Sequence, residues 1–287
     1  MRTIRQIYPA PPKHWVGDGF HVSPLFSHMD EVCKHTSPFL MLDYGMPTEF
    51  APNSGTPRGV GSHPHAGFET VTVVLQGEVA HRDSSGSGGI IREGGVQWMT
   101  AGRGIIHEEY HSKDFSERGG VLEELQFWVN LPRKFKEIAP EYQALPKEKI
   151  PVVRQGDAKV SVIAGELNNI KGAARTFSEI NLWILDLPVQ GRAEFDLPAN
   201  HNVMLVILRG NVSINGRMAK PTELVTFEVE NGRIGLQAQD EPVKLALCGG
   251  IPIDEPVVGY GPFVMNTHEE ILEKIRAFKA GKFGLLD

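Results

Sequence analysis

The sequence predicts an all-β protein built from two copies of one β unit and followed by a single C-terminal helix. Its 31 glycines and 20 prolines are spread along all 287 residues, and they divide the chain into short segments rich in Val, Ile, Phe and Thr. Segments of this length and composition are typical of β-strands. Two stretches, "VTVVLQGEVAH" and "VMLVILRGNVSIN", repeat one pattern of strand, glycine turn and returning strand. The fold class is therefore all-β, with internal repetition.

The strands are expected in segments bounded by turn residues, among them "LEELQFWVNL", "KVSVIAGEL", "LWILDLPV" and "ELVTFEVENGRIGLQA". Asn215-Gly216 and Asn231-Gly232 are dipeptides that suit two-residue hairpin turns, because both residue types tolerate positive φ angles. The sequence "SSGSGG" has no phosphate-loop signature and is interpreted as a flexible hairpin loop.

One helix is predicted near the C-terminus, in "NTHEEILEKIRAFKAGKFG". Thr267 and Glu270 have the spacing of a capping box, and Gly281 can end the helix. An apolar stripe is expected to pack against a β surface. Its members are Ile271, Leu272, Ile275 and Phe278.

The length of the chain predicts two domains. Between the repeats lies "LPRKFKEIAPEYQALPKEKIP", a segment rich in charge and proline that is interpreted as the interdomain connection. We therefore expect an N-terminal domain over residues 1–140 and a C-terminal domain over residues 150–287.

Composition excludes several functional classes. With 41% hydrophobic and 22% charged residues, the chain is an ordinary globular protein, and its net charge of -6 argues against direct binding of nucleic acid. Its two cysteines lie far apart and form no zinc ribbon or disulfide framework. No run of eighteen apolar residues occurs, so we expect a cytoplasmic protein without a membrane span.

Two histidine clusters indicate a metal site. His63 and His65 are separated by one residue, and on a strand residues i and i+2 point to the same face. His107 and Glu109 have the same spacing in "TAGRGIIHEEYH". Two such pairs on adjacent strands would supply three imidazoles and one carboxylate, a set that suits Fe(II), Mn(II), Ni(II) or Zn(II). His81 and His111, which flank the clusters, are expected to be solvated or to support ligands from outside.

The clusters match the metal-binding half of a cupin, a small jelly-roll barrel. "HPHAGFETVTVVLQG", "QWMTAGRGIIHEE", "SPFLMLDYGMP" and "GPFVMNTHEEI" resemble the pirins, a family of bicupins, along nearly the whole chain. The resemblance implies two tandem cupin barrels and assigns the ligands to His63, His65, His107 and Glu109. In many other cupins the carboxylate ligand comes from the first motif, which would be Glu69.

The second repeat has lost these residues. Laying Gly77 on Gly210 without gaps replaces the four ligand positions by Asp196, Pro198, Asp240 and Pro242. His201 lies nearby, but as a lone histidine it is interpreted as structural. One metal is therefore expected per chain, in the N-terminal domain.

The resemblance implies a metal-dependent dioxygenase that opens a flavonol such as quercetin at the 2,3-bond and releases carbon monoxide. The expected metal is Fe(II), with Zn, Mn, Co or Ni as alternatives, and the general base is Glu109 or Glu69. The family also suggests a non-enzymatic regulator that senses metal or redox state and binds a transcription factor or metabolic enzyme. Another cupin enzyme, acting on a small oxygenated metabolite, is a third interpretation.

Overall fold

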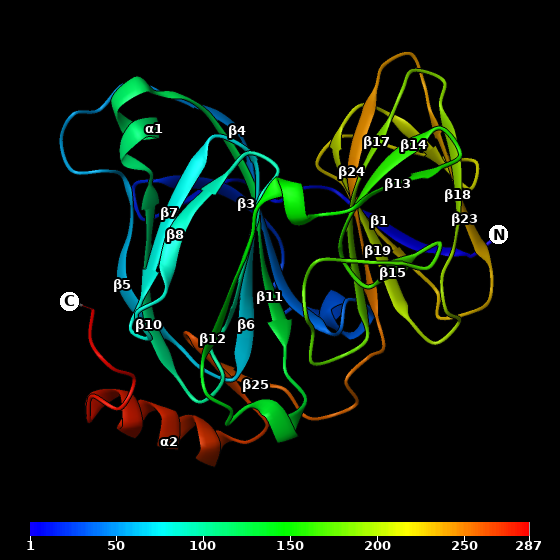
Figure 1. Ribbon diagram of the computed structural model, residues 1–287. Coiled ribbons are helices and arrows are strands. Elements are labelled where there is room, and N and C mark those ends of the chain that lie inside the picture. The colour runs from blue at the N-terminus through cyan, green and yellow to red at the C-terminus, as the bar shows by residue number, and fades with distance from the viewer. Residues whose placement is uncertain (287) are drawn as a thin grey trace. The chain divides into compact units, whose positions relative to one another are not determined.

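The computed structural model describes residues 1–286 and confirms two cupin barrels with a C-terminal helix (Figure 1). The chain forms two compact units. One contains Pro12–Glu31, Phe39–Lys147 and Ile253–Asp287, and the other contains Met1–Pro11, Val32–Pro38 and Glu148–Pro252. These units are interleaved in sequence, so the continuous domains 1–140 and 150–287 stay a prediction.

The N-terminal barrel consists of a seven-stranded and a four-stranded antiparallel sheet. The larger sheet has the order β12(Glu141–Leu145), β9(Val96–Thr100), β6(Phe68–Gln76), β11(Gly120–Asn130), β4(Phe39–Phe50), β3(Phe20–Phe26), β2(His14–Val16). The smaller sheet has the order β5(Gly59–His65), β10(Ile105–His111), β7(Glu78–Asp83), β8(Gly88–Arg92). Part of the core between them is a cluster of buried aliphatic and aromatic side chains that includes Val74, Val79 and Leu122.

The C-terminal barrel repeats this strand order. Its seven-stranded sheet runs β1(Ile4–Tyr8), β22(Leu224–Phe227), β19(Asn202–Arg209), β24(Val243–Gly250), β17(Ile180–Leu187), β14(Ala158–Ala164), β13(Val152–Gln155). Its four-stranded sheet runs β18(Arg192–Asp196), β23(Arg233–Ala238), β20(Val212–Ile214), β21(Arg217–Ala219). Strand for strand, β18 and β23 take the places of β5 and β10, which confirms that one β unit occurs twice.

The first strand of the chain, β1, belongs to the C-terminal barrel. It pairs with β22 antiparallel, with Tyr8 opposite Leu224. The equivalent edge of the N-terminal barrel is filled by β12, which comes from the predicted interdomain connection and pairs with β9. In the C-terminal barrel the edge strand of the larger sheet is thus β1, which lies far away in sequence from the other strands of that barrel. In the N-terminal barrel it is β12, which follows the other strands of its sheet in sequence.

Helix α2(His268–Lys279) has the predicted capping box, in which Thr267 and Glu270 bond reciprocally. The predicted apolar stripe is only partly correct. Ile271 is buried, but Leu272 is 53% exposed. Lys274 is buried in its place, and its Nζ donates to the carbonyl of Arg103 at 3.1 Å. The aliphatic stem of a lysine covers apolar surface when its ammonium group finds acceptors.

The other elements are short. The helices are α1(Lys113–Arg118), η1(Glu31–His35), η2(Arg133–Phe135) and η3(Lys147–Lys149), and the strand pairs are β15(Glu166–Leu167) with β16(Ile170–Lys171) and β25(Val258–Tyr260) with β26(Phe263–Met265). Within residues 1–286, no helix has both the length and the apolar character needed to cross a bilayer.

The two predicted hairpin turns differ in outcome. Asn215 and Gly216, with φ angles of 50° and 82°, join β20 and β21 as expected. Asn231-Gly232 is not a hairpin turn, because β22 and β23 on either side of it belong to different sheets. The dipeptide there carries the chain from one layer of the barrel to the other.

Candidate metal centre

Strands β5 and β10 bring the three predicted histidines together. In their ladder His107 lies opposite His63, and Ile105 lies opposite His65. The ring centroids of His63 and His107 are 4.3 Å apart, and both are 4.8 Å from that of His65. One ligand atom from each residue lies within 4.8 Å of the other two. This spacing allows three imidazoles to coordinate one ion.

The ring nitrogens of these histidines have distinct surroundings. The Nδ1 atom of His63 lies 2.8 Å from the carbonyl of Gly61, and that of His65 lies 3.4 Å from the carbonyl of Pro262. A carbonyl only accepts, so each contact favours a proton on Nδ1 and a lone pair on Nε2. The Nε2 atom of His107 is buried without a hydrogen-bond partner. An orphaned buried nitrogen among imidazoles fits a metal ligand.

Burial keeps the imidazoles of His65 and His107 neutral, which is the form that binds metal. Desolvation, reinforced by repulsion from His63, lowers the pKa of His65 to about 3. Desolvation, followed by repulsion from His65, His63 and His81, lowers the pKa of His107 well below its ordinary value. Near neutral pH, protons therefore do not compete with a metal ion for the lone pairs of His65 and His107.

Glu109 lies two residues beyond His107 on β10, on the same face of the strand. It forms a second cluster with His81 and His107, whose ligand atoms again lie within 4.8 Å of one another. Its Oε1 atom lies 3.2 Å from both Thr72 Oγ1 and Gln97 Nε2. The carboxylate is thus buried inside the barrel and held by polar side chains.

Aromatic rings form a wall beside the histidines. The Trp128 ring stacks on Phe68, with centroids 4.3 Å apart and planes inclined by 29°. The Trp128 centroid is also 5.3 Å from that of His65. These rings give the site an apolar side that can pack against a planar ligand.

Glu69 faces away from this interior. Its carboxylate accepts a hydrogen bond of 2.8 Å from Thr100. On β6 it differs in parity from Thr72, which contacts Glu109. The i+4 argument from His65 fails because the chain turns at Gly67, where φ is +89°, between β5 and β6. Burial raises the pKa of Glu69 to about 7 despite the hydrogen bond from Thr100.

Comparison with known families decides the classification. The pirin family model matches residues 19–129, and the model of the pirin C-terminal cupin domain matches residues 182–284. A pirin-like protein of tomato, Solanum lycopersicum, is 38% identical over 88% of this chain and 83% of its own. This chain belongs to the pirin family.

Two further proteins are similar to this chain over nearly their whole length. A Pseudomonas aeruginosa protein, provisionally named a quercetin 2,3-dioxygenase, is 45% identical over 99% of both chains. The crystal structure of a quercetin 2,3-dioxygenase from Acinetobacter baumannii is also 45% identical, with a TM-score of 0.95 and 99% of each chain covered. These similarities cover both barrels and the C-terminal helix.

Two polar residues of this pirin, Asp83 and Gln97, were not assigned to the site from sequence, and His81 was expected to be solvated or to support the ligands. Strand β7 lies on the other side of β10 from β5, and it places Asp83 opposite His107 and His81 opposite Glu109. His81 is buried rather than solvated. Gln97 on β9 is fully buried between His81 and Glu109. The signal was available in "HRD", which has the same i, i+2 spacing as "HPH".

His111 does not reach the metal centre. It is buried between Phe20 and Phe50, and its Nε2 donates to the carbonyl of Gly19 at 2.8 Å. Its role is structural, at the other end of β10.

The C-terminal barrel has a different site geometry from the one that the ungapped repeat suggests. Asp196 on β18 lies opposite Arg233 on β23, so β23 rather than Asp240 and Pro242 occupies the place of β10. The hairpins of this barrel are shorter, which shifts the alignment. Strands β18 and β23 contain no histidine. His201 is buried, and its Nε2 pairs with Glu179 Oε1 at 3.1 Å.

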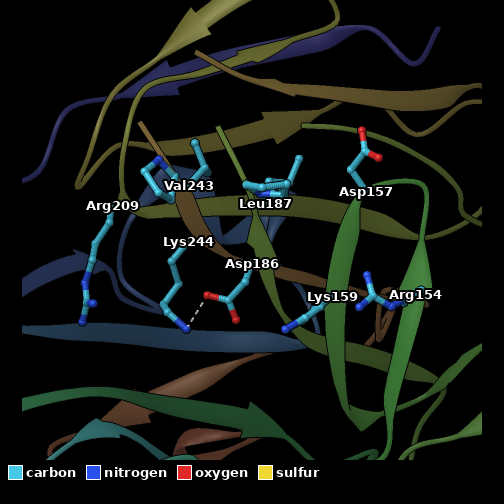
Figure 2. Close-up of a pocket in the computed structure, with 10 residues that line it drawn as sticks. Arg154, Asp157, Lys159, Asp186, Leu187, Arg209, Val243 and Lys244 are labelled. Carbon is cyan, nitrogen blue, oxygen red and sulfur yellow. Dashed lines mark ion pairs between the residues drawn. The ribbon is translucent and has the colours of Figure 1, made fainter. Parts of the chain in front are cut away.

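A surface hollow of the C-terminal barrel also lacks imidazoles. Its cavity of about 430 Å³ is lined by charged side chains that include Arg154, Lys159 and Arg209. Figure 2 shows Lys244 paired with Asp186 there, with nitrogen and oxygen 2.7 Å apart. An ammonium and a carboxylate that neutralise each other do not form a metal site.

Proposed function

We propose that this pirin is a metal-dependent dioxygenase that opens a flavonol at the 2,3-bond, as in quercetin 2,3-dioxygenases. The observation that carries the proposal is the convergence of three imidazoles, with the buried carboxylate of Glu109 two residues beyond His107 and an aromatic wall beside His65. The names of the full-length relatives support the same activity.

We propose His63, His65, His107 and Glu109 as the metal ligands. The three imidazoles present Nε2 lone pairs, and Glu109 adds an oxygen ligand from the next same-face position on β10. Mixed nitrogen and oxygen ligands suit Fe(II), which is our first choice. The metal, when bound, would supply Lewis acidity and sites for a substrate oxygen and dioxygen.

The protein's own residues would bind and orient the substrate. Trp128, which is half-buried and backed by the fully buried Phe68 ring, offers apolar surface against which a flat flavonol can pack. Glu109 is the proposed acceptor of the proton from the flavonol 3-hydroxyl group. Thr72 Oγ1 lies 2.6 Å from Gln126 Oε1 and 3.2 Å from Glu109 Oε1. Its single hydroxyl proton can therefore be donated to Glu109 when that carboxylate is ionised, and to Gln126 when Glu109 is protonated.

The test is flavonol turnover by protein of known metal content. Apoprotein is loaded anaerobically with Fe(II), Mn(II), Co(II) or Ni(II), mixed with quercetin in air and followed by the loss of the flavonol absorbance band and the release of carbon monoxide. We expect turnover with at least one metal and none in His63→Ala. An unchanged band with every metal, in protein shown to be loaded, would reject the dioxygenase.

A further inference from the structure

Gln97 has only one amide orientation that satisfies its neighbours. Its Nε2 lies 3.2 Å from Glu109 Oε1, and a carboxylate oxygen can only accept. The amide nitrogen must therefore face Glu109. In the flipped orientation two acceptor oxygens would meet in a buried site, which is unfavourable. The amide oxygen then faces the hydroxyl of Tyr142, at 3.5 Å.

The orientation of Gln97 fixes the tautomer of His81. The same Gln97 Nε2 lies 3.2 Å from His81 Nδ1, so His81 Nδ1 must accept and cannot carry a proton. The proton of the neutral ring is then on Nε2, which lies 3.1 Å from Asp83 Oδ2. The Tyr142 ring stacks on His81, with centroids 5.1 Å apart and planes inclined by 10°. The stacking on Tyr142 thus fixes the plane of the His81 ring, and the contact with Gln97 fixes which of its nitrogens carries the proton.

Asp83 is held from its other side by the hairpin turn. Its Oδ1 accepts from the backbone nitrogen of Ser85 at 2.8 Å, the Ser85 hydroxyl at 2.6 Å and the backbone nitrogen of Ser87 at 3.3 Å. Burial alone would raise the pKa of Asp83, but the hydrogen bonds from His81 and Ser85 outweigh it and lower this pKa. A buried, ionised carboxylate is therefore aimed at His81.

The chain of hydrogen bonds ends on a proposed ligand. His81 Nδ1 lies 3.3 Å from His107 Nδ1. Because His81 Nδ1 carries no proton, a proton on His107 Nδ1 is the arrangement that avoids two lone pairs facing each other, and Gln97 and His107 then share the lone pair of His81 Nδ1. This leaves the lone pair of the neutral His107 ring on Nε2. That nitrogen is the buried atom without a partner.

The contacts of the second cluster, of His81, His107 and Glu109, do not suit a metal ion. Gln97 Nε2 donates to both His81 and Glu109, so its N–H groups point into the space that a cation would need. A cation there would face donors rather than lone pairs. His81 and Gln97 form a hydrogen-bond network behind the first cluster, which Glu109 joins through its Oε1 atom.

We propose that Asp83 and His81 are positioning residues, which hold His107 in the tautomer that presents Nε2 to the metal. The chain runs from Asp83 Oδ2 through His81 to His107 Nδ1. Hydrogen-bond partners of this kind orient ligating histidines and strengthen metal binding about 10- to 100-fold. The inference rests on the metal centre of the proposed function, but it is independent of the flavonol substrate.

Asp83→Asn is the sharpest test, because it keeps the shape of the side chain and replaces the acceptor at the end of the hydrogen-bond chain by a donor. The backbone donors at Ser85 and Ser87 require an oxygen, so the amide nitrogen of the new side chain must face His81. In the variant His81 then faces N–H donors on both sides, Gln97 at Nδ1 and the new amide at Nε2, so its proton has no acceptor at either nitrogen and no longer fixes the tautomer of His107. We expect long-range ¹⁵N–¹H spectra of histidine-labelled apoprotein to show Nδ1-protonated His107 in the wild type and a mixture of the two His107 tautomers in the variant.

Metal affinity, measured by Co(II) titration against a chelator, should fall about 10- to 100-fold in Asp83→Asn. Ser85→Ala is the matched control: it removes one hydrogen bond to Asp83 Oδ1 and should retain both the tautomer and the affinity. His63→Ala should lose metal with the His107 tautomer unchanged, which separates failure of the metal centre from failure of the positioning chain. Nε2-protonated His107 in wild-type apoprotein, or wild-type affinity in Asp83→Asn, would overturn the proposal. The wild-type spectrum decides the question even if Asp83→Asn does not fold.

Discussion

His63 and His107 lie directly opposite each other in the ladder of β5 and β10, with ring centroids 4.3 Å apart. The register changes immediately beyond this pair, because Glu109 lies opposite Val60 rather than Gly61. An irregularity of this kind re-aims side chains at the end of a barrel. Two residues far apart in sequence thus become neighbours through strand pairing alone.

Removal of either member of this pair should abolish tight metal binding. His63→Ala and His107→Ala each delete one of three imidazoles, and the two imidazoles that remain with Glu109 hold an ion less tightly than the full set of four ligands. We expect the metal content of purified protein to fall from near one per chain to below a tenth, as measured by elemental analysis. His201→Ala in the C-terminal barrel is the control and should retain the full metal content.

Glu69→Gln and Glu109→Gln should behave differently. Glu69 bonds to Thr100 on the opposite face of β6, so we expect its replacement to leave metal content unchanged. Glu109→Gln should reduce flavonol turnover at least 100-fold, because an amide cannot accept the proton. Loss of metal in Glu69→Gln together with its full retention in Glu109→Gln would transfer the ligand role to Glu69.

The pKa of Glu69 also predicts a pH effect on stability. Burial raises this pKa to about 7, above that of the unfolded chain, so the folded state binds more protons between pH 4.5 and 7. The free energy of unfolding contributed by this group is therefore present at low pH and is lost as the pH rises towards 7. Denaturant titrations should show this loss in the wild type and a smaller one in Glu69→Gln.

His65 predicts the opposite trend at lower pH. Its folded pKa of about 3 lies below the ordinary value of 6.5, so the unfolded chain binds more protons between these limits. Stability of the apoprotein should fall as the pH falls from 6.5, by about 1.4 kcal/mol per pH unit for this one group. His65→Asn should reduce this slope in denaturant titrations, and an unchanged slope would contradict the assignment to His65.

Lys136 should be essential to the stability of the N-terminal barrel. It is 1% exposed, and its Nζ donates to the carbonyls of Gly67 and Val264 and to Asn130 Oδ1, at 2.6 to 3.0 Å. Lys136→Met leaves these buried acceptors unpaired and should cost about 3 kcal/mol of unfolding free energy. Lys134→Met, at an exposed position two residues earlier, should change it by less than about 0.5 kcal/mol.

The ligand histidines could be predicted because two-residue spacing places side chains on one face of a strand regardless of the fold around it. The direction of the Glu69 side chain could not be predicted in this way. The turn at Gly67 begins a new alternation of inward and outward side chains, and the residues beside it carry no further signal of that turn. His81 and Asp83 have the same spacing as the ligands. Their burial depends on β7 lying beside β10, and this pairing comes from the tertiary fold.

The repeat was visible in sequence, but its alignment was not. Strand β23 takes the place of β10 because the hairpins that precede it are shorter than those of the N-terminal barrel. An alignment without gaps cannot represent this difference in hairpin length. Asn231-Gly232 likewise has the composition of a hairpin turn, although the strands on its two sides enter different sheets. Local sequence specifies the elements well, whereas long-range pairing decides their partners.

The pairing of β1 with β22 has a consequence for biosynthesis. Residues Ile4–Tyr8 leave the ribosome well before their partners Leu224–Phe227, which follow more than two hundred residues later. Closing so long a loop is entropically costly, and such distant pairs form slowly. The C-terminal barrel therefore completes its sheet only after Leu224–Phe227 have been synthesised. A fragment that begins at residue 150 would expose β22 as an unpaired edge, open to association with other chains.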